Sequence, residues 1–369
     1  MSAAGAVAHL LPAPGIPLRG PSGASAHARD LGAALARRGS VSVFAAVEAD
    51  SRGVHGPPVP GAVVSGVPAW PRAGSSWRWM REVGAARRMA DAVVAAGRVR
   101  PFAWILERHS LFSDAGWRAA DALGVPWVLE VNAPPVRERR AHETLPVPWL
   151  ASRWERAVLR AAPLVAAVSP WLVQWLEGDI GCRRVLLLPN GTALPPGDRS
   201  RGRAALGLPD GVPLLGALGV ARAWHGGDRL RPLAEALGAR LLVVGPPAGA
   251  VAGALCPGPL HGQALADVLA ACDLGVAPYT VDAPPWLCPL KVLDFRGQGV
   301  PVVGSAVGAL PALVAGAGAA VPAGDDAALR AAAGDWIGRP TAPLRRTWDT
   351  VAEELAAAVA GLDRLSERP

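Results

Sequence analysis

One lysine stands alone in this chain of 369 residues, at a place that suits a phosphate. Lys291 is the only lysine among 37 basic residues, and it follows Pro289 and Leu290. A helix that begins near Leu290 would place Lys291 in its first turn, beside backbone amides that lack a partner within the helix. Asp294 would share that helix face and suits ribose hydroxyls, unless the two side chains form a plain surface ion pair, which would contribute little. We therefore predict that this segment binds a phosphate-bearing donor.

The other rare residue types also fall in candidate segments. Tyr279 is the only tyrosine, and Asn132 and Asn190 are the only asparagines. A coding bias that removes these types elsewhere should leave them where a chemical role resists substitution.

A second candidate loop runs from Gly219 to Gly227. It carries Arg222, Trp224 and His225 between an expected strand and an expected helix. A cation beside a glycine-flanked helix start suits a diphosphate. The tryptophan at such a loop has packing as its alternative role.

A third loop is rich in glycine and precedes the first expected helix. Gly15, Gly20 and Gly23 let backbone amides approach an anion, and His27 follows on the helix. The spacing is not Gly-x-Gly-x-x-Gly, so a simple dinucleotide fingerprint is absent, and an ordinary turn is the alternative.

Polar residues follow two further expected strands. Glu107, Arg108 and His109 come after one strand, and Glu130 and Asn132 come at the end of the next. The carboxyl ends of parallel strands share one edge, so these groups could orient an acceptor hydroxyl or accept its proton. The alternative is that Glu107 and Arg108 pair with each other.

Several familiar sites are missing from the sequence. There is no Asp-x-Asp motif, Walker loop, Gly-x-Ser-x-Gly elbow or His/Cys cluster, so we expect no metal and no cofactor. The four cysteines form no Cys-x-x-Cys pair, which indicates neither zinc nor a disulfide framework. They are Cys182, Cys256, Cys272 and Cys288.

The elements around these loops predict an α/β protein with two doubly wound, Rossmann-like domains. Short apolar runs alternate with helical patterns, as in parallel sheets. The expected strands are Val7–Leu11, Val41–Val47, Ala103–Leu106, Trp127–Val131, Leu164–Val168, Val185–Leu188, Pro213–Leu218, Leu241–Val244, Leu274–Pro278 and Pro301–Val303. The expected helices include Ser25–Arg38, Leu265–Ala271, Leu290–Gln298 and Leu344–Leu365.

A break at Pro195-Pro196-Gly197-Asp198 divides the pattern. We expect one domain over residues 1–195, a second over 196–342 and a terminal helix over 343–369, with the chemistry in a cleft between the halves.

Composition narrows the class of protein. The net charge is +7, but the arginines are scattered and no aromatic-studded basic stripe appears, which argues against nucleic acid. Weak attraction to acidic lipid or an anionic donor remains, so membrane contact is at most peripheral. The uncharged stretches contain Pro and Gly and lack a signal peptide's basic start, so we expect a cytoplasmic protein.

With these residues in view, the chain resembles bacterial retaining glycosyltransferases of family 4, over about residues 7 to 362. The first half matches in Pro14 to His27, Glu107 to Phe112, Leu129 to Pro134, Val168-Ser169 and Pro189 to Gly191. The second half matches in Trp224 to Gly226, Ala277 to Tyr279, Pro289-Leu290-Lys291 and Gly299 to Val303. Each piece is weak, and their order and spacing together are specific.

The resemblance implies a GT-B fold and front-face transfer, with retention, from a nucleotide-diphosphate sugar. It makes residues 1–195 the acceptor-binding domain and residues 196–342 the nucleotide-sugar-binding domain, with the terminal helix packing back on the first. It assigns Arg222 and Lys291 to the diphosphate, Asp294 to the ribose and His261-Gly262 to the nucleobase. The donor set is Gly23, Arg222, Trp224, His225, His261, Gly262, Pro289, Leu290, Lys291 and Asp294. The catalytic set is Arg108, His109, Arg222 and Lys291, and the acceptor set is Glu107, Glu130 and Asn132.

Two positions depart from the family's pattern. The family's paired glutamates would fall at Trp286 and Asp294. Tryptophan therefore replaces the first glutamate, and the shorter aspartate replaces the second. The usual histidine beside the reacting centre aligns near Arg108 or His109.

Several alternatives stay open at this point. A related enzyme could epimerise a nucleotide sugar without an acceptor, and a non-catalytic protein could bind the sugar nucleotide. A periplasmic solute receptor shares the sheet pattern but should carry a signal peptide. The acceptor could be a small natural product, such as an aminocyclitol or nucleoside, or an envelope polysaccharide or lipid-linked sugar. Trp70, Trp77 and Trp79 could stack on it or be buried.

Overall fold

The computed structural model describes residues 5–13, 15–18, 20, 22–48, 59–69, 78–142, 145, 147–220 and 222–366. The chain forms two compact units. Unit 1 comprises Met1–Pro189 and Trp348–Pro369, and unit 2 comprises Asn190–Thr347.

Both crossings between the units differ from the expected positions at 195 and 343. Asn190 already belongs to unit 2, because its backbone N–H donates to Sγ of Cys288 and its Nδ2 donates to the Cys288 carbonyl. The chain also remains in unit 2 beyond residue 343, since the N–H of Leu344 donates to the carbonyl of Arg296.

Unit 1 is built on a parallel sheet whose strand order is β3-β2-β1-β4-β5-β6-β7. The strands are β1 Val7–Leu11, β2 Val41–Glu48, β3 Ala62–Ala69, β4 Trp104–Arg108, β5 Trp127–Val131, β6 Leu164–Ala167 and β7 Val185–Leu187. Strands β1, β4, β5 and β6 are buried along their whole length, as expected for a parallel sheet covered on both faces.

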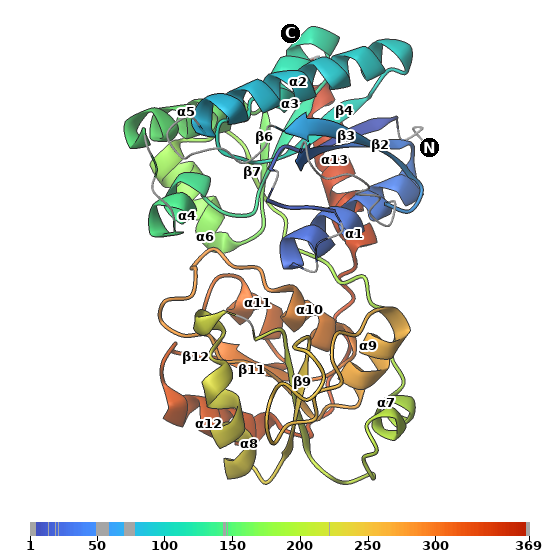
Figure 1. Ribbon diagram of the computed structural model, residues 1–369, viewed down its shortest axis with the longest axis vertical. Helices are drawn as coiled ribbons and strands as arrows, with labels where there is room; N and C mark the ends of the chain where they lie inside the picture. The colour runs from blue at the N-terminus through green and yellow to red at the C-terminus, as the bar shows by residue number, and fades with distance from the viewer. Residues whose placement is uncertain are drawn as a thin grey trace. The chain divides into compact units, whose positions relative to one another are not determined.

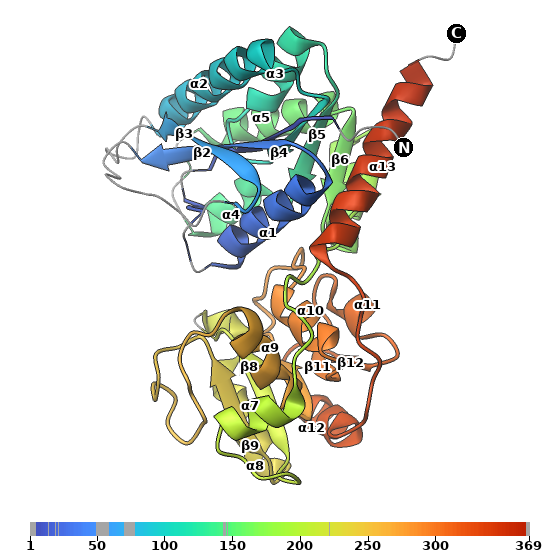
Figure 2. The ribbon, with the colours of Figure 1, turned by 90° about the vertical axis from the view of Figure 1, so that its right-hand side faces the viewer.

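Helices cover both faces of this sheet, with α1 and α13 on one side and α2 and α3 on the other (Figures 1 and 2). The helical segments are α1 Gly23–Arg38, α2 Arg78–Val99, α3 Ala115–Leu123, α4 Pro135–His142, α5 Pro148–Ala161, α6 Pro170–Gln174, the π-helix η2 Trp175–Ile180 and α13 Trp348–Ser366. The terminal helix α13 packs against α1, and Arg37 pairs with Asp349 at 2.7 Å.

Unit 2 holds a parallel sheet of order β12-β11-β10-β8-β9. Its strands are β8 Leu214–Leu218, β9 Arg240–Val244, β10 Leu274–Ala277, β11 Val302–Ser305 and β12 Gly318–Val321. Its helical segments are α7 Arg199–Ala205, η3 Ala223–His225, η4 Gly227–Arg229, α8 Leu230–Ala236, α9 Gly262–Ala270, α10 Leu290–Gly297, α11 Leu310–Val314 and α12 Asp326–Trp336.

Apolar side chains of α8 and α12 share one core with the strands of unit 2. On α10, Phe295 packs so closely on β8 and β10 that a Cβ at Gly216 or Gly275 would lie within 3.0 Å of its ring. This contact fixes α10, and with it Lys291, against the centre of the sheet.

All ten expected strands are present, with ends that differ by at most two residues. The sequence pattern missed the edge strands β3 and β12. In β3, Gly66 and Pro68 interrupt the valines, and β12 is Gly-Ala-Ala-Val, so neither shows the uninterrupted apolar run of the other strands. Among the described residues, no helix is both long and apolar enough to span a membrane.

Candidate functional site

Each sheet reverses its strand order at one point, and the candidate residues gather there. In unit 2, β8 lies between β9 and β10, and in unit 1, β1 lies between β2 and β4. Doubly wound sheets bind ligands outside the carboxyl ends of their strands at such points.

In unit 2, Lys291 lies in the first turn of α10, as the sequence predicted. The helix follows Pro289, which offers no side-chain cap, so the amides of Leu290 and Lys291 precede the helix's own hydrogen bonds. The Lys291 ammonium donates to the carbonyl of Gly219, just beyond β8, over 2.6 Å. Burial lowers the pKa of Lys291 to about 8. A cation is thus held between a helix N-terminus and the end of a strand.

Aromatic rings form the wall beside this lysine. The ring of Tyr279 is buried, and its centroid lies 5.6 Å from the Lys291 ammonium. Trp224 lies 5.8 Å from Tyr279 and 4.2 Å from His225, measured between ring centroids. The Thr280 N–H donates to the Trp224 carbonyl, which joins the loops after β8 and β10. Trp224 therefore packs within the site's wall.

The loop also needs a glycine at Gly226. Its φ is 67°, and a Cβ there would lie 1.9 Å from the carbonyl oxygen of Pro278. Only glycine allows both this left-handed conformation and this close approach.

His225 is a neutral hydrogen-bond donor in this site. The backbone N–H of Arg222 donates to its Nδ1 over 3.3 Å, so the proton of a neutral ring is on Nε2. Burial, together with the positive charges of Lys291 and Arg222, lowers the pKa of His225 to about 4. The positive charge of the site at neutral pH therefore comes from Lys291 and from the exposed Arg222.

Other donor candidates lie around the same sheet edge. His261 is exposed and precedes α9, whose first residue, Gly262, has a φ of 54°. The Gly245 N–H donates to the Gly258 carbonyl beyond β9, which places the chain leading to His261 beside that strand's carboxyl end.

Asp294 is engaged within unit 2 itself. Its Oδ1 accepts the hydroxyl of Thr192 over 2.7 Å, and Thr192 is buried. A ribose would have to share this carboxylate with Thr192, a partner that the sequence analysis did not identify. Trp286, which occupies the position of the family's first glutamate, is buried.

In unit 1, a buried hydrogen-bonded pair of side chains lies near the carboxyl end of β5. Nε2 of His27 and Oε1 of Glu130 are 2.6 Å apart, and each side chain is 4% exposed. The ring of Trp348, at the start of α13, meets the His27 ring edge-on with centroids 4.6 Å apart. Burial alone would raise the pKa of Glu130, but His27, Arg108 and His9 outweigh it and lower the pKa to about 2.

Unpaired polar atoms surround this pair. Buried polar groups almost always have hydrogen-bond partners, so a cluster of unpaired atoms marks a place for water or a ligand. The unpaired atoms here are Nδ1 and Nε2 of His9, Nη1 of Arg108, Nδ1 and Nε2 of His109, Oε2 of Glu130 and Nδ2 of Asn132. Strand register places Arg108 opposite Glu130, and the His109 N–H donates to the Glu130 carbonyl. His9, His27 and Arg108 all lie close enough to Glu130 to lower its pKa, and the backbone of His109 adjoins this group.

Glu107 departs from its expected role at the acceptor. Its carboxylate accepts the Ser113 hydroxyl over 2.5 Å and the Gly116 N–H over 2.9 Å, and it is fully buried. A Cβ at Gly116 would lie 2.6 Å from the Glu107 carboxylate and 2.4 Å from the Trp127 indole nitrogen. Glu107 thus anchors the start of α3, and it does not join the unpaired cluster. Burial raises its pKa to about 7.

The glycine-rich loop leads into α1, where Ser22 caps the helix by accepting the Ser25 N–H. Gly23 is exposed in the first turn, and the guanidinium of Arg29 holds the carbonyls of Leu18 and Gly20 at 2.5 and 2.9 Å. Arg29 of α1 therefore fixes the described part of the loop.

Comparisons with known proteins agree with this arrangement. A family model described as a glycosyl transferase 4-like domain matches residues 22–191. The D-inositol 3-phosphate glycosyltransferase of Stackebrandtia nassauensis is 29% identical over 323 residues, covering 76% of this chain and 70% of that protein. Residues 22–191 therefore match a glycosyl transferase 4-like domain, and most of the chain is similar to a glycosyltransferase.

Solved structures show the same fold across the length of this glycosyltransferase. Sucrose-phosphate synthase from Thermosynechococcus elongatus superposes with a TM-score of 0.69 at 19% identity, covering 98% of each chain. HepE of Anabaena, in complex with UDP and glucose, gives a TM-score of 0.60 at 17% identity, again over 98% of each chain. The fold is GT-B, and the protein is a transferase.

Sequence reasoning missed two features of the glycosyltransferase's site. His9 lies inside the apolar strand β1, so nothing in the pattern marks it. His27 was included with the glycine-rich loop, but its partner Glu130 is 103 residues away, and no local spacing reveals such a pair.

The tryptophans proposed for the acceptor have different outcomes. Trp70 and Trp77 lie outside the described residues. Trp79 packs in a small core, with its ring 6.2 Å from that of Phe112. This contact favours the buried alternative for Trp79.

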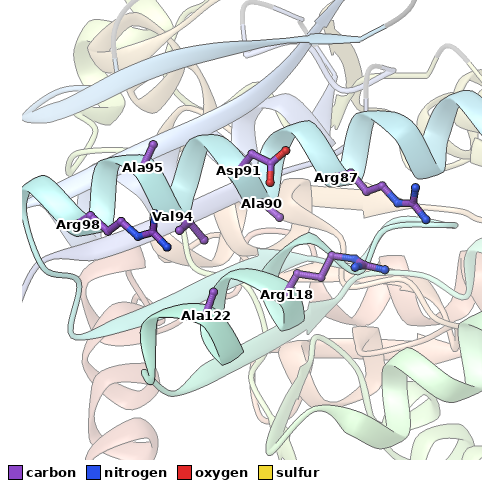
Figure 3. Close-up of a pocket in the computed structure, with 8 residues that line it drawn as sticks. All are labelled: Arg87, Ala90, Asp91, Val94, Ala95, Arg98, Arg118 and Ala122. Carbon is purple, nitrogen blue, oxygen red and sulfur yellow. The ribbon is translucent and has the colours of Figure 1, made fainter.

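A separate groove of about 580 Å³ lies between α2 and α3 (Figure 3). Three arginines border it, and one of them, Arg118, pairs with Asp114 at 2.9 Å. The lining residues are Arg87, Ala90, Asp91, Val94, Ala95, Arg98, Arg118 and Ala122. None of the sequence-predicted site residues is among them. Among the described residues, no group of three or more His, Cys, Asp or Glu side chains could hold a metal ion.

Proposed function

We propose that this glycosyltransferase moves a sugar from a nucleoside-diphosphate donor to a small polyhydroxylated acceptor, with retention and without a metal. The observation that carries the proposal is Lys291, held at the N-terminus of α10 and 2.6 Å from the Gly219 carbonyl.

A diphosphate fits the donor side because its two charges need cations and N–H donors at one place. Lys291 and Arg222 supply the charge, and the first amides of α10 and the Nε2 of His225 supply hydrogen bonds. These protein cations take the part that a divalent metal plays in other transferases, which supports metal independence.

The reaction breaks the bond between the anomeric carbon and the diphosphate oxygen. Negative charge then grows on that oxygen, where Lys291 and the α10 amides can stabilise it. The acceptor hydroxyl attacks from the same face, and its proton passes to the departing phosphate oxygen. The family 4 resemblance supports this front-face course and hence retention.

For the acceptor side, we propose the unpaired cluster of unit 1. Arg108, His109 and Asn132 offer donors, and Oε2 of Glu130 offers an acceptor, as a polyhydroxylated ligand requires. The relative named as a D-inositol 3-phosphate glycosyltransferase supports cyclitols as the first acceptors to test. A small natural product of the cyclitol or nucleoside type fits the same cluster, and an envelope glycan is the alternative.

The test measures binding of UDP-, GDP-, ADP- and TDP-sugars in EDTA by the wild type and by Lys291→Ala. We expect one donor to bind without metal and to be lost in the variant. Arg330→Ala, which removes an exposed arginine of α12, is the matched control and should bind normally.

Product analysis then separates the remaining functions. A glycoside whose anomeric proton coupling matches that of the donor supports retaining transfer. An epimerised nucleotide sugar, or donor binding without turnover across the acceptor panel, would refute the proposal in favour of an epimerase or a non-catalytic binder. Binding that requires added Mg²⁺ would refute metal independence.

A further inference from the structure

Two half-buried tryptophans and an arginine form a second surface on unit 1 that the donor and acceptor assignments do not use. The rings of Trp171 and Trp175 are stacked, with planes 16° apart and centroids separated by 6.4 Å. The guanidinium of Arg137 lies over the Trp171 ring, 5.3 Å from its centroid. Arg137 itself is exposed.

This surface lies at the same sheet edge as the unpaired cluster. Trp171 is in the first turn of α6, which begins directly after β6, and Arg137 is in the first turn of α4, which begins directly after β5. Strands β5 and β6 are neighbours, and Asn132 stands between β5 and α4. The Arg137–Trp171 contact therefore bridges two loops that border the cluster.

Hydrogen bonds also hold the helical segments that carry the two tryptophans, α6 and η2. The buried hydroxyl of Ser169 caps α6 by accepting the Leu172 N–H. Trp175 begins the π-helix η2, a rare conformation that occurs often at functional sites. Two arginines of α5 hold the far end of η2, because Arg156 donates to the Asp179 carbonyl over 2.5 Å and Arg160 to the Ile180 carbonyl over 2.6 Å. Such support fixes the position of the indoles before any ligand binds.

We propose that Trp171, Trp175 and Arg137 form an acceptor subsite for a saturated oxygen-bearing ring, either a pyranose or a cyclitol. This inference rests on the proposed function, since it names the class of acceptor for the same site.

The chemistry follows from the side chains. The C–H bonds on one side of such a ring are apolar and pack on an indole, whereas its hydroxyl oxygens accept hydrogen bonds from a guanidinium. A flexible linear polyol offers no such flat apolar side, so the subsite should discriminate between cyclic and acyclic acceptors. The unpaired cluster would then engage hydroxyls at the other end of the same ring.

The experiment measures binding of myo-inositol, methyl α-D-glucopyranoside and glycerol by saturation-transfer NMR, first without a donor and then in the presence of the donor identified above. We expect the wild type to bind both rings more tightly than glycerol, with saturation of ring C–H protons. Trp171→Ala should weaken ring binding by about 5- to 10-fold, the scale of a lost aromatic contact, and Trp171→Phe should restore most of it. Trp117→Ala, at an exposed tryptophan of α3, is the control and should change nothing.

The outcomes separate this inference from the proposed function. Equal ring affinities of Trp171→Ala and the wild type would overturn the subsite even if transfer occurs. No binding of either ring by the wild type would overturn it too. Failure of every donor to bind, with ring binding intact and sensitive to Trp171, would refute the proposed donor chemistry while the subsite stands. Acceptor KM should rise in Trp171→Ala while hydrolysis of the donor without acceptor stays unchanged.

Discussion

The two polar regions of this glycosyltransferase use charge in opposite ways. In unit 2, Lys291 and Arg222 carry like charges, and no ion pair with a carboxylate is found for either among the described residues. Lys291 also lies in the first turn of α10, whose N-terminus has no side-chain cap. In unit 1, the Glu130 carboxylate already has a partner, since Nε2 of His27 lies 2.6 Å away and both side chains are buried. The first arrangement lacks an anionic partner. In the second, the two side chains already pair with each other, and only the buried polar atoms around them lack partners.

This difference separates binding from stability. Removing a cation whose partner is the ligand should lower activity and change the free energy of unfolding little. Removing one partner of a buried pair leaves an uncompensated polar group, and so it should cost folding energy directly. The predictions below test that division, from the largest effect to the smallest.

The largest effect is expected for Glu130→Ala. Removal of the carboxylate leaves the buried ring of His27 without its partner, and the buried Arg108 loses a compensating charge. We expect the free energy of unfolding, measured in urea at pH 7, to fall by about 3–5 kcal/mol. The control is Asp349→Ala, which removes the exposed pair with Arg37 and should cost at most about 1 kcal/mol.

The Glu130 carboxylate also predicts how the stability of the protein depends on pH. The pKa of Glu130 is about 2 in the folded protein, below its ordinary value of 4.5, so its contribution to stability is complete above pH 4.5. That contribution is lost as the pH falls from about 4.5 to about 2. The stability difference between the wild type and Glu130→Gln should therefore shrink over this range, and a difference that stays constant would argue against an ionised Glu130.

Lys291→Ala is expected to have the next largest effect, on turnover. Loss of one donor to a developing charge lowers kcat by roughly 100- to 1,000-fold in comparable sites. The melting temperature should change little, because the ammonium donates to a backbone carbonyl, that of Gly219, and holds no buried carboxylate among the described residues. A large fall in melting temperature with normal specific activity of the folded fraction would reverse the comparison between the two units.

The pKa of Lys291 predicts a smaller, graded effect. Burial lowers this pKa to about 8, so the free enzyme loses the ammonium charge as the pH rises through 8. We expect kcat/KM to fall about tenfold per unit of pH above that value, since this ratio reports the free enzyme's essential groups. Lys291→Arg should remove the fall, because a guanidinium stays protonated. A profile that is flat to pH 9.5 in the wild type would show that the charge of Lys291 is not required.

The sequence predicted the strands well because buried parallel strands are continuous apolar runs. It predicted the position of Lys291 for a local reason too, since Pro289 marks a helix start a few residues away. The sequence did not predict the edge strands β3 and β12, because glycine, proline and alanine there interrupt the run of apolar, β-branched residues.

Contacts across the chain could not be predicted in this way. Glu107 and Glu130 each follow the same local rule, as acids at the ends of neighbouring strands. Only the fold shows that Glu107 meets Ser113 and Gly116, whereas Glu130 meets a histidine 103 residues away. Residue type and spacing identified the edge of the sheet, and the side-chain partners at that edge required the structure.

The smallest effect is expected at the contact between Thr192 and Asp294, which joins residues 102 positions apart. Thr192→Val keeps the shape and removes the hydroxyl, so the Asp294 carboxylate loses a donor, at a cost of about 1 kcal/mol in the free energy of unfolding. If Asp294 also holds the ribose, the loss of one competing hydrogen-bond donor should leave donor affinity the same or raise it slightly. Asp294→Asn should then weaken the donor while Thr192→Val does not, as measured by titration calorimetry. Equal weakening by both variants would show that Asp294 serves the fold of unit 2 and reaches the donor only through it.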